Sequence, residues 1–260
     1  MATFVYAFRS EWLKRKRSSA SLMLLGGSLF TPAIVATVRL LNYRTLPAIY
    51  AGDAFWKNLW SASWESMAVF FLPMTAILAT SLVTQIEYRG NAWKQVHALP
   101  MSSALLFLAK LAVILVMMVQ FLVLFCAGIY VSGMTPSLLV PGVPAPKGSF
   151  FDLPLLRDSA LYFVDCLPIV AAQYAMGLRA NNVLVPIGAG FLAWVGALAA
   201  VSSRFAIWWP YAYTTINYIK DTPKGAAFAA HTELHALALG FFVLLTLAGY
   251  VSFITKPEKG

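Results

Sequence analysis

The 260-residue chain is 60% hydrophobic and only 11% charged, and its mean hydropathy is +0.73. Soluble domains carry about 25% charged residues, so this composition excludes an ordinary soluble protein and indicates an integral membrane protein. The net charge of +9 invites a nucleic-acid partner, but the basic residues crowd ahead of the first apolar run. That position attracts anionic lipid headgroups and places the amino terminus in the cytoplasm. We therefore expect the lipid bilayer, and no nucleic acid, as a partner.

The first 19 residues predict an interfacial helix. Phe4, Val5, Phe8 and Trp12 share one helical face, and a basic cluster follows them. A cleaved signal peptide is the competing interpretation, because a basic stretch precedes an apolar one. The long amphipathic lead-in and the lack of a clear small-x-small cleavage site argue against it.

Six apolar runs follow, each of a length that can cross a hydrocarbon layer as a helix. They cover about 20–38, 66–86, 103–131, 159–178, 183–201 and 234–254. The predicted fold is an all-α integral membrane protein with one transmembrane domain over residues 1–260. Its parts are the interfacial helix (1–19), spans one to five (20–201), an outer aromatic segment (202–233), and span six with the tail (234–260). We expect a multi-pass protein of the cell's inner membrane with both termini cytoplasmic.

The stretch 85–100 is a polar island between the second and third runs. From Asn91 onward, Trp93, Val96 and Leu99 fall on one helical face. Asn91 can cap the start of a helix, and Pro100 ends it, because the residue before a proline avoids helical geometry. This pattern predicts a small amphipathic helix under the membrane with a charged rim.

Aromatic residues crowd the stretch 202–224, at the positions Phe205, Trp208, Trp209, Tyr211, Tyr213 and Tyr218. Such rings favour the boundary between membrane and water. We expect this segment to dip into the outer interface as short helices.

Polar residues inside the spans are the next candidates. Asp165 is costly in hydrocarbon, so it should face the bundle interior, a partner or water, either as part of a gate or as a hydrogen-bonded structural group. Gln85, Gln120 and Gln173 can form hydrogen bonds between helices. Lys110 can extend back to the cytoplasmic surface. Prolines within the spans release backbone groups and predict kinks, at Pro32, Pro73, Pro168 and Pro186.

Motifs for independent chemistry are weak. The stretch 142–149 lacks the Gly-Lys-Ser/Thr order of a phosphate loop. His231 and His235 lie at i and i+4 around Glu233, yet a metalloprotease helix has its glutamate directly after the first histidine. Cys126 and Cys166 both lie in apolar runs, where packing is the expected role.

The whole chain resembles a permease of the type-2 ABC exporter family, nearest to the small permeases of lantibiotic-immunity and bacitracin-resistance transporters. The likeness rests on the amino-terminal helix, six spans, the outer aromatic segment and the stretch after the second span. There the family pattern acidic-x-Arg-Gly, then Lys, then Leu-Pro-x-Ser falls on Glu87, Tyr88, Arg89, Gly90, Lys94, Leu99, Pro100 and Ser102.

The resemblance implies that this stretch is a coupling helix that docks on a separate ATPase subunit. The residues expected at that contact are Glu87, Tyr88, Arg89, Gly90, Trp93, Lys94, His97, Leu99 and Pro100. It also implies a second permease subunit, identical or a sibling, with ATP and Mg held by the ATPase and no cofactor, metal or catalytic residue in this chain. The expected translocation path or gate residues are Asp165, Gln173, Trp208, Trp209 and Tyr211.

The expected function is ATP-driven export of an amphipathic substrate, such as a peptide antibiotic or a lipid-linked molecule. Two alternatives remain open at this point. One is an intramembrane enzyme, metal-dependent through His231, Glu233 and His235 or using Asp165. The other is an assembly or sensor subunit that binds an ATPase without moving substrate.

Overall fold

The structure is a computed structural model that describes residues 2–16, 18–86, 102–220 and 233–255. The described residues form helices and connecting turns, without strands, as the all-α prediction requires. The helices, in chain order, are α1 (Ala2–Lys16), α2 (Ser19–Leu41), η1 (Tyr43–Thr45), α3 (Leu46–Tyr50), α4 (Phe55–Ser66), η2 (Met67–Phe71), α5 (Leu72–Thr84), α7 (Ser103–Leu139), α8 (Leu153–Arg179), α9 (Leu184–Ala200), η4 (Ala206–Trp208), η5 (Pro210–Ala212), α10 (Tyr213–Ile219) and α11 (Leu234–Ile254).

Five helical segments among the described residues are long and apolar enough to cross a membrane. They are Ser19–Leu41, Phe55–Thr84, Ser103–Leu139, Pro154–Arg179 and Leu234–Ile254. The predicted fifth span corresponds to α9, which has 17 residues. At 1.5 Å per residue α9 is about 25 Å long, somewhat short of a hydrocarbon layer of about 30 Å. The chain is therefore an integral membrane protein, and its described residues include five long apolar helices and one shorter one.

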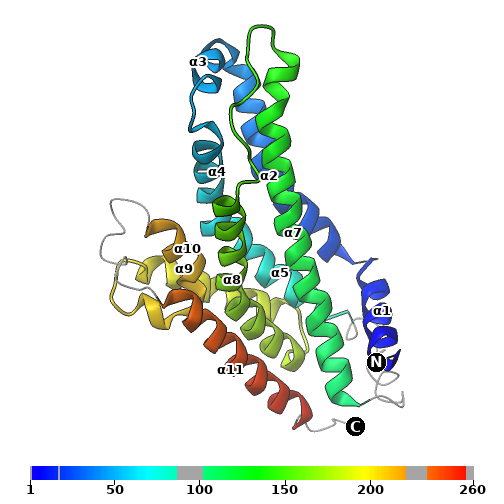
Figure 1. Cartoon of the computed structure of the whole chain (residues 1–260). Helices are drawn as coiled ribbons and strands as arrows, with labels where there is room; N and C mark the ends of the chain where they lie inside the picture. The colour runs from blue at the N-terminus through cyan, green and yellow to red at the C-terminus, as the bar shows by residue number, and fades with distance from the viewer. Residues whose placement is uncertain (1, 17, 87–101, 221–232, 256–260) are drawn as a thin grey trace.

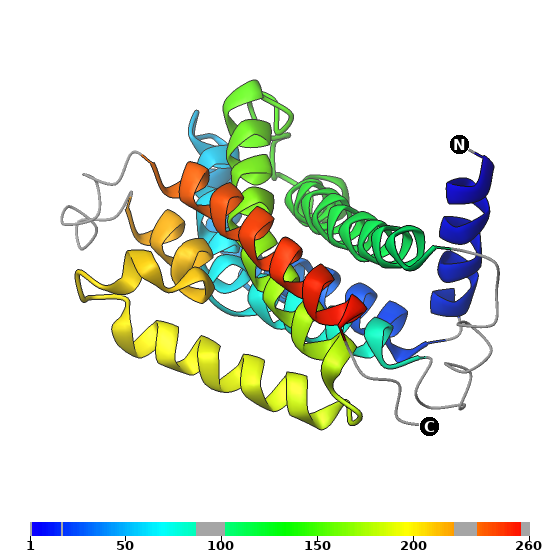
Figure 2. The ribbon, with the colours of Figure 1, turned by 90° about the horizontal axis from the view of Figure 1, so that it is seen from below.

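The bundle is organised around two helix pairs (Figure 1). α2 packs along α7, and α11 packs along α8, while α5 lies between α2 and α8 and contacts both. Figures 1 and 2 both place α1 beside α7, on the side of the bundle away from α9 and α10. The short helices η5 and α10 pack against α8, α9 and η2, and η4 packs against η5; these three helices belong to the described part of the aromatic segment.

The second and third crossings are longer than predicted. The region 39–65, expected as a loop, contains α3 and α4, and α4 continues through η2 into α5. Lys57, Asn58 and Glu65 lie on the exposed side of α4. Its opposite side buries Trp56, Leu59 and Trp64 within the protein. α7 likewise runs to Leu139, beyond the expected end at 131.

The irregular helical turn at the junction between η2 and α5 is explained by Pro73. Pro73 has no N–H group, so the carbonyl of Val69, four residues earlier, loses its usual helical donor. The preceding residues, Met67–Phe71, form a π-helical turn, an irregularity found where regular helical bonding is interrupted. The indole of Trp194 on α9 donates to the Val69 carbonyl at 2.9 Å. The side chain of a neighbouring helix thus replaces the bond that the proline removed.

Trp194→Phe is expected to destabilise the chain by about 1 kcal/mol, because it removes the donor of a partly buried hydrogen bond between helices. Unfolding in mixed detergent micelles, followed by circular dichroism, measures this change. The matched control is Trp208→Phe, since the Trp208 side chain is 67% exposed. Equal stability of the two variants would contradict the role given to the indole N–H.

Candidate functional site

A buried polar cluster joins α8, α10 and α11. We call it the Asp165 cluster: Asp165, Asn217 and His235. Asn217 Nδ2 donates to Asp165 Oδ2 at 2.7 Å, and His235 Nδ1 shares a hydrogen bond of 2.8 Å with Asp165 Oδ1. Asp165 is fully buried, and Asn217 is 4% exposed. Both oxygens of the carboxyl group therefore have partners, as the cost of leaving a buried polar group unpaired requires.

A second polar group lies on the same helix, two turns further along. Ser81 Oγ of α5 donates to Gln173 Oε1 at 3.2 Å, and Gln173 Nε2 donates to the Tyr211 hydroxyl at 2.9 Å. Burial raises the pKa of Tyr211, in η5, to about 12, although its hydrogen bond with Gln173 acts in the opposite direction. The phenol therefore stays protonated at neutral pH.

The five predicted gate residues fall into two groups. Asp165, Gln173 and Tyr211 lie at the contact between the aromatic segment and the long helices, where Asp165 and Gln173 are fully buried. Trp208 and Trp209 lie on the surface, with 67% and 42% of their side chains exposed. Trp209 Nε1 donates to the carbonyl of Ala193 at 2.9 Å and so ties the segment to α9. Only the first group forms a buried site.

The predicted coupling residues all lie outside the described residues. They are Glu87, Tyr88, Arg89, Gly90, Trp93, Lys94, His97, Leu99 and Pro100. The described residues on either side of them are held firmly. Gln85 Nε2 donates to the carbonyls of Gly177 and Ala180 at 2.9 and 2.7 Å, at the end of α8. At the other side, Ser102 caps α7 by accepting from the Leu105 amide at 3.3 Å.

The amino-terminal helix is attached to α7 by charged groups. Lys110 Nζ donates to Glu11 Oε2 at 2.8 Å, and the side chains are 6% and 5% exposed. Lys14 pairs with the other oxygen of Glu11. One turn along α1, Arg15 Nη1 donates to Gln120 Oε1 at 2.8 Å. Lys110, predicted to extend back to the cytoplasmic surface, thus places its ammonium group against a carboxylate of α1, the predicted interfacial helix.

Glu11→Gln is expected to weaken the docking of α1 on α7 by about 1 kcal/mol, because a neutral amide replaces a charge-assisted bond to Lys110. Hydrogen exchange of the α1 amides in detergent, which rises as the docked state is depopulated, measures this change. Arg9→Gln on the exposed side of α1 is the matched control and should leave the exchange unchanged. Unchanged exchange in Glu11→Gln would contradict the proposed attachment.

The histidine pair was the basis of the metal alternative. His231 lies outside the described residues, and His235 is engaged with Asp165. Glu233 precedes α11 and makes no side-chain capping bond. Among the residues that the structure describes, no group of three or more His, Cys, Asp or Glu is placed to hold a metal ion.

Sequence reasoning missed three partners of these sites. Asn217 and Ser81 are short polar residues in apolar surroundings, and Glu11 is the acidic residue in a basic helix. Each carried a weak signal, because a polar residue facing the inside of a bundle needs a partner. To identify the partner of such a residue, one must know how the helices are placed relative to one another, and sequence periodicity does not give this information.

The fold and these contacts define the class of the protein as a multi-pass α-helical membrane protein whose buried polar groups join its helices. A sequence family described as ABC-2 family transporter protein matches residues 7–197. The chain belongs to this family, and it is the transmembrane subunit of an ABC transporter. No curated protein and no solved structure gives a significant match. The matched range includes Asp165, Gln173 and the predicted coupling stretch, and it ends before Asn217 and His235.

Proposed function

We propose that this chain is the permease subunit of an ATP-driven exporter and that a separate ATPase subunit drives it through residues 87–100. Family membership carries the proposal, since the matched range runs through this stretch. The ATPase would hold ATP and Mg. Glu87, Arg89, Lys94 and His97 would make polar contacts with it, and Trp93, Val96 and Leu99 would seat the helix.

The anchoring of the flanking residues supports this mechanism. A push on residues 87–100 moves the rest of the protein only if their ends are tied to rigid helices. Gln85 is bonded to the last turn of α8, and Thr84 packs so closely on Gly177 that a Cβ there would lie 2.9 Å from Thr84 Cβ. On the other side the stretch leads into α7, whose Lys110 is bound to α1. Displacement would thus reach α8, α7 and α1 together.

The Asp165 cluster and the Gln173–Tyr211 bond would carry the motion onward. Both connect α8 to the segment 202–233, which we assign as the gate on the outer side. The basic cluster indicates that the amino terminus of this inner-membrane protein is cytoplasmic. Residues 87–100 would then lie on the same side of the membrane as the ATPase. Two permease subunits, identical or siblings, would enclose the path, and the substrate would be an amphipathic molecule such as a peptide antibiotic or a lipid-linked compound.

Affinity purification of the tagged full chain in mild detergent, from the cells that naturally make it, tests the proposal. We expect a stoichiometric nucleotide-hydrolysing subunit to copurify, and Arg89→Ala to reduce its yield or to abolish ATP-dependent export from vesicles. Arg44→Ala, which removes an exposed basic residue of η1 outside the coupling stretch and the gate, is the control and should change neither. A chain that purifies alone with bound zinc would contradict the proposal and favour the metal-dependent enzyme.

A further inference from the structure

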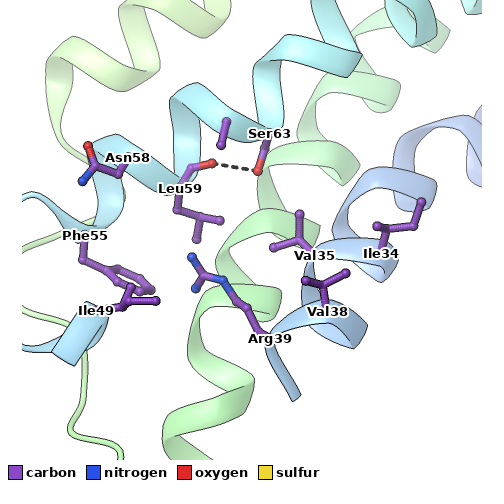
Figure 3. Close-up of a pocket in the computed structure, with 10 residues that line it drawn as sticks. Ile34, Val35, Val38, Arg39, Ile49, Phe55, Asn58, Leu59 and Ser63 are labelled. Carbon is purple, nitrogen blue, oxygen red and sulfur yellow. Dashed lines mark hydrogen bonds between the residues drawn. The ribbon is translucent and has the colours of Figure 1, made fainter. Parts of the chain in front are cut away.

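A cavity of about 320 Å³ lies between α2, α3 and α4 (Figure 3). Ile34, Val35 and Val38 of α2 form one apolar wall, and Ile49, Phe55 and Leu59 of α3 and α4 form the other. The side chains of Ile34, Val38 and Ile49 are each about half exposed on the surface of the bundle. The cavity therefore opens sideways, toward the bilayer that surrounds the spans.

One cation projects into this apolar space. Arg39, in the last turn of α2, lines the cavity, and Figure 3 shows its guanidinium turned toward Phe55 and Leu59. The guanidinium carbon lies 4.8 Å from the centre of the Phe55 ring and 5.5 Å from that of Tyr50. Two aromatic rings thus hold the charged group in place, an arrangement that favours arginine over lysine.

The guanidinium has donors to spare. Nη1 donates to the Tyr50 hydroxyl at 3.0 Å, and this hydroxyl in turn donates to the Gly133 carbonyl at 2.7 Å. Tyr50 is fully buried, so its position is fixed. No ion pair formed by the described residues includes Arg39. An arginine has five N–H donors, and a fixed cation with free donors beside an apolar surface is suited to an anion.

We infer that this cavity binds an anionic phospholipid of the surrounding bilayer, with its phosphate on Arg39 and part of one acyl chain between α2 and α4. Three observations converge on this ligand. The cation lies near the end of a membrane-spanning helix, where lipid headgroups are found. The lining below it is mainly apolar, with Asn58 and Ser63 as its polar members, and the half-exposed Ile34, Val38 and Ile49 lie at the entrance. A soluble anion would use the guanidinium alone and would gain nothing from Ile34, Val35 and Val38. The inference does not depend on whether the chain exports a substrate.

The test uses the full chain, delipidated in a neutral detergent and titrated with a short-chain phosphatidylglycerol, with bound lipid counted by native mass spectrometry. Arg39→Gln is expected to weaken phosphatidylglycerol binding roughly tenfold, and Arg39→Lys several-fold, because lysine keeps the charge but loses the bidentate fork. Arg44→Gln changes an exposed arginine beyond the end of the same helix and should alter binding less than twofold. Val35→Phe retains the cation but fills the apolar half of the cavity, and it should weaken binding to a similar extent as Arg39→Gln.

Each other outcome overturns the inference in a defined way. Equal binding by Arg39→Gln and wild type would place the lipid elsewhere. Weak binding by Arg39→Gln together with full binding by Val35→Phe would indicate a headgroup contact at the surface. Competition by inorganic phosphate at concentrations equal to the lipid would identify a simple anion site. Circular dichroism and gel filtration of each variant separate loss of the site from loss of the fold.

Discussion

Asp165→Ala is expected to destabilise the chain by about 3–5 kcal/mol, the largest effect of any single substitution proposed for it. Removing a buried carboxyl group that hydrogen-bonds two polar side chains leaves both of them without that partner, at about 1–3 kcal/mol for each. Here the carboxylate is fully buried and serves both Asn217 and His235, so two groups lose their partner at once. The contact that joins α10 and α11 to α8 would be lost with it.

Unfolding in mixed micelles, followed by circular dichroism, measures this effect. Asp165→Asn is the informative comparison: its amide can accept from Asn217 and donate to His235 Nδ1, so we expect it to recover most of the lost stability. Asp158→Ala, on the same helix and partly exposed, is the control and should change the free energy of unfolding by less than about 0.5 kcal/mol. Wild-type stability of Asp165→Ala would show that the cluster does not hold these helices together.

Gly190→Ala is expected to cost about 1–3 kcal/mol through overpacking. A Cβ at this position would overlap with Gln173 Nε2 and would lie 2.9 Å from Ile77 Cγ2. Gln173 must then move, and its bond to Tyr211 breaks, so we also expect loss of export if the aromatic segment acts as the gate.

Gly188→Ala is the matched control for this substitution, because it lies on the same helix and a Cβ there meets nothing within 4 Å. Alanine favours a helix over glycine by up to about 1 kcal/mol, so Gly188→Ala should be neutral or stabilising. In thermal unfolding in detergent, we therefore expect Gly190→Ala to lower the Tm relative to wild type and Gly188→Ala to leave it unchanged or raise it. Two variants of equal stability would contradict the tight contact between α9 and α8.

The polar residues within the spans were the most predictable part of the site. Gln85, Gln120 and Gln173 were predicted to bond between helices, and each does so. The membrane makes this inference strong, since water is absent and a buried amide must find a partner in the protein. Their functional roles, like that of Asp165, remain proposals.

Other parts of the fold depended on tertiary contacts. The continuation of α4 into the second crossing could not be inferred from hydropathy, because its tryptophans pack on other helices rather than on lipid. Trp64 stacks on Tyr162 of α8 with ring centres 4.0 Å apart. The partner of Lys110 was not predictable for a related reason: Glu11 lies on α1, and only the docking of α1 on α7 brings the two side chains together. In both cases a side chain of a neighbouring helix makes the contact that water or lipid would otherwise make.

The central claim is that residues 87–100 receive work from an ATPase on the cytoplasmic side. Labelling of Lys94→Cys, in a chain with Cys126→Ala and Cys166→Ala, tests it most directly with a membrane-impermeant maleimide. The account predicts no labelling in intact cells, strong labelling in inverted vesicles stripped of the ATPase, and protection when the ATPase is added back. Labelling of position 94 from outside intact cells would contradict the account.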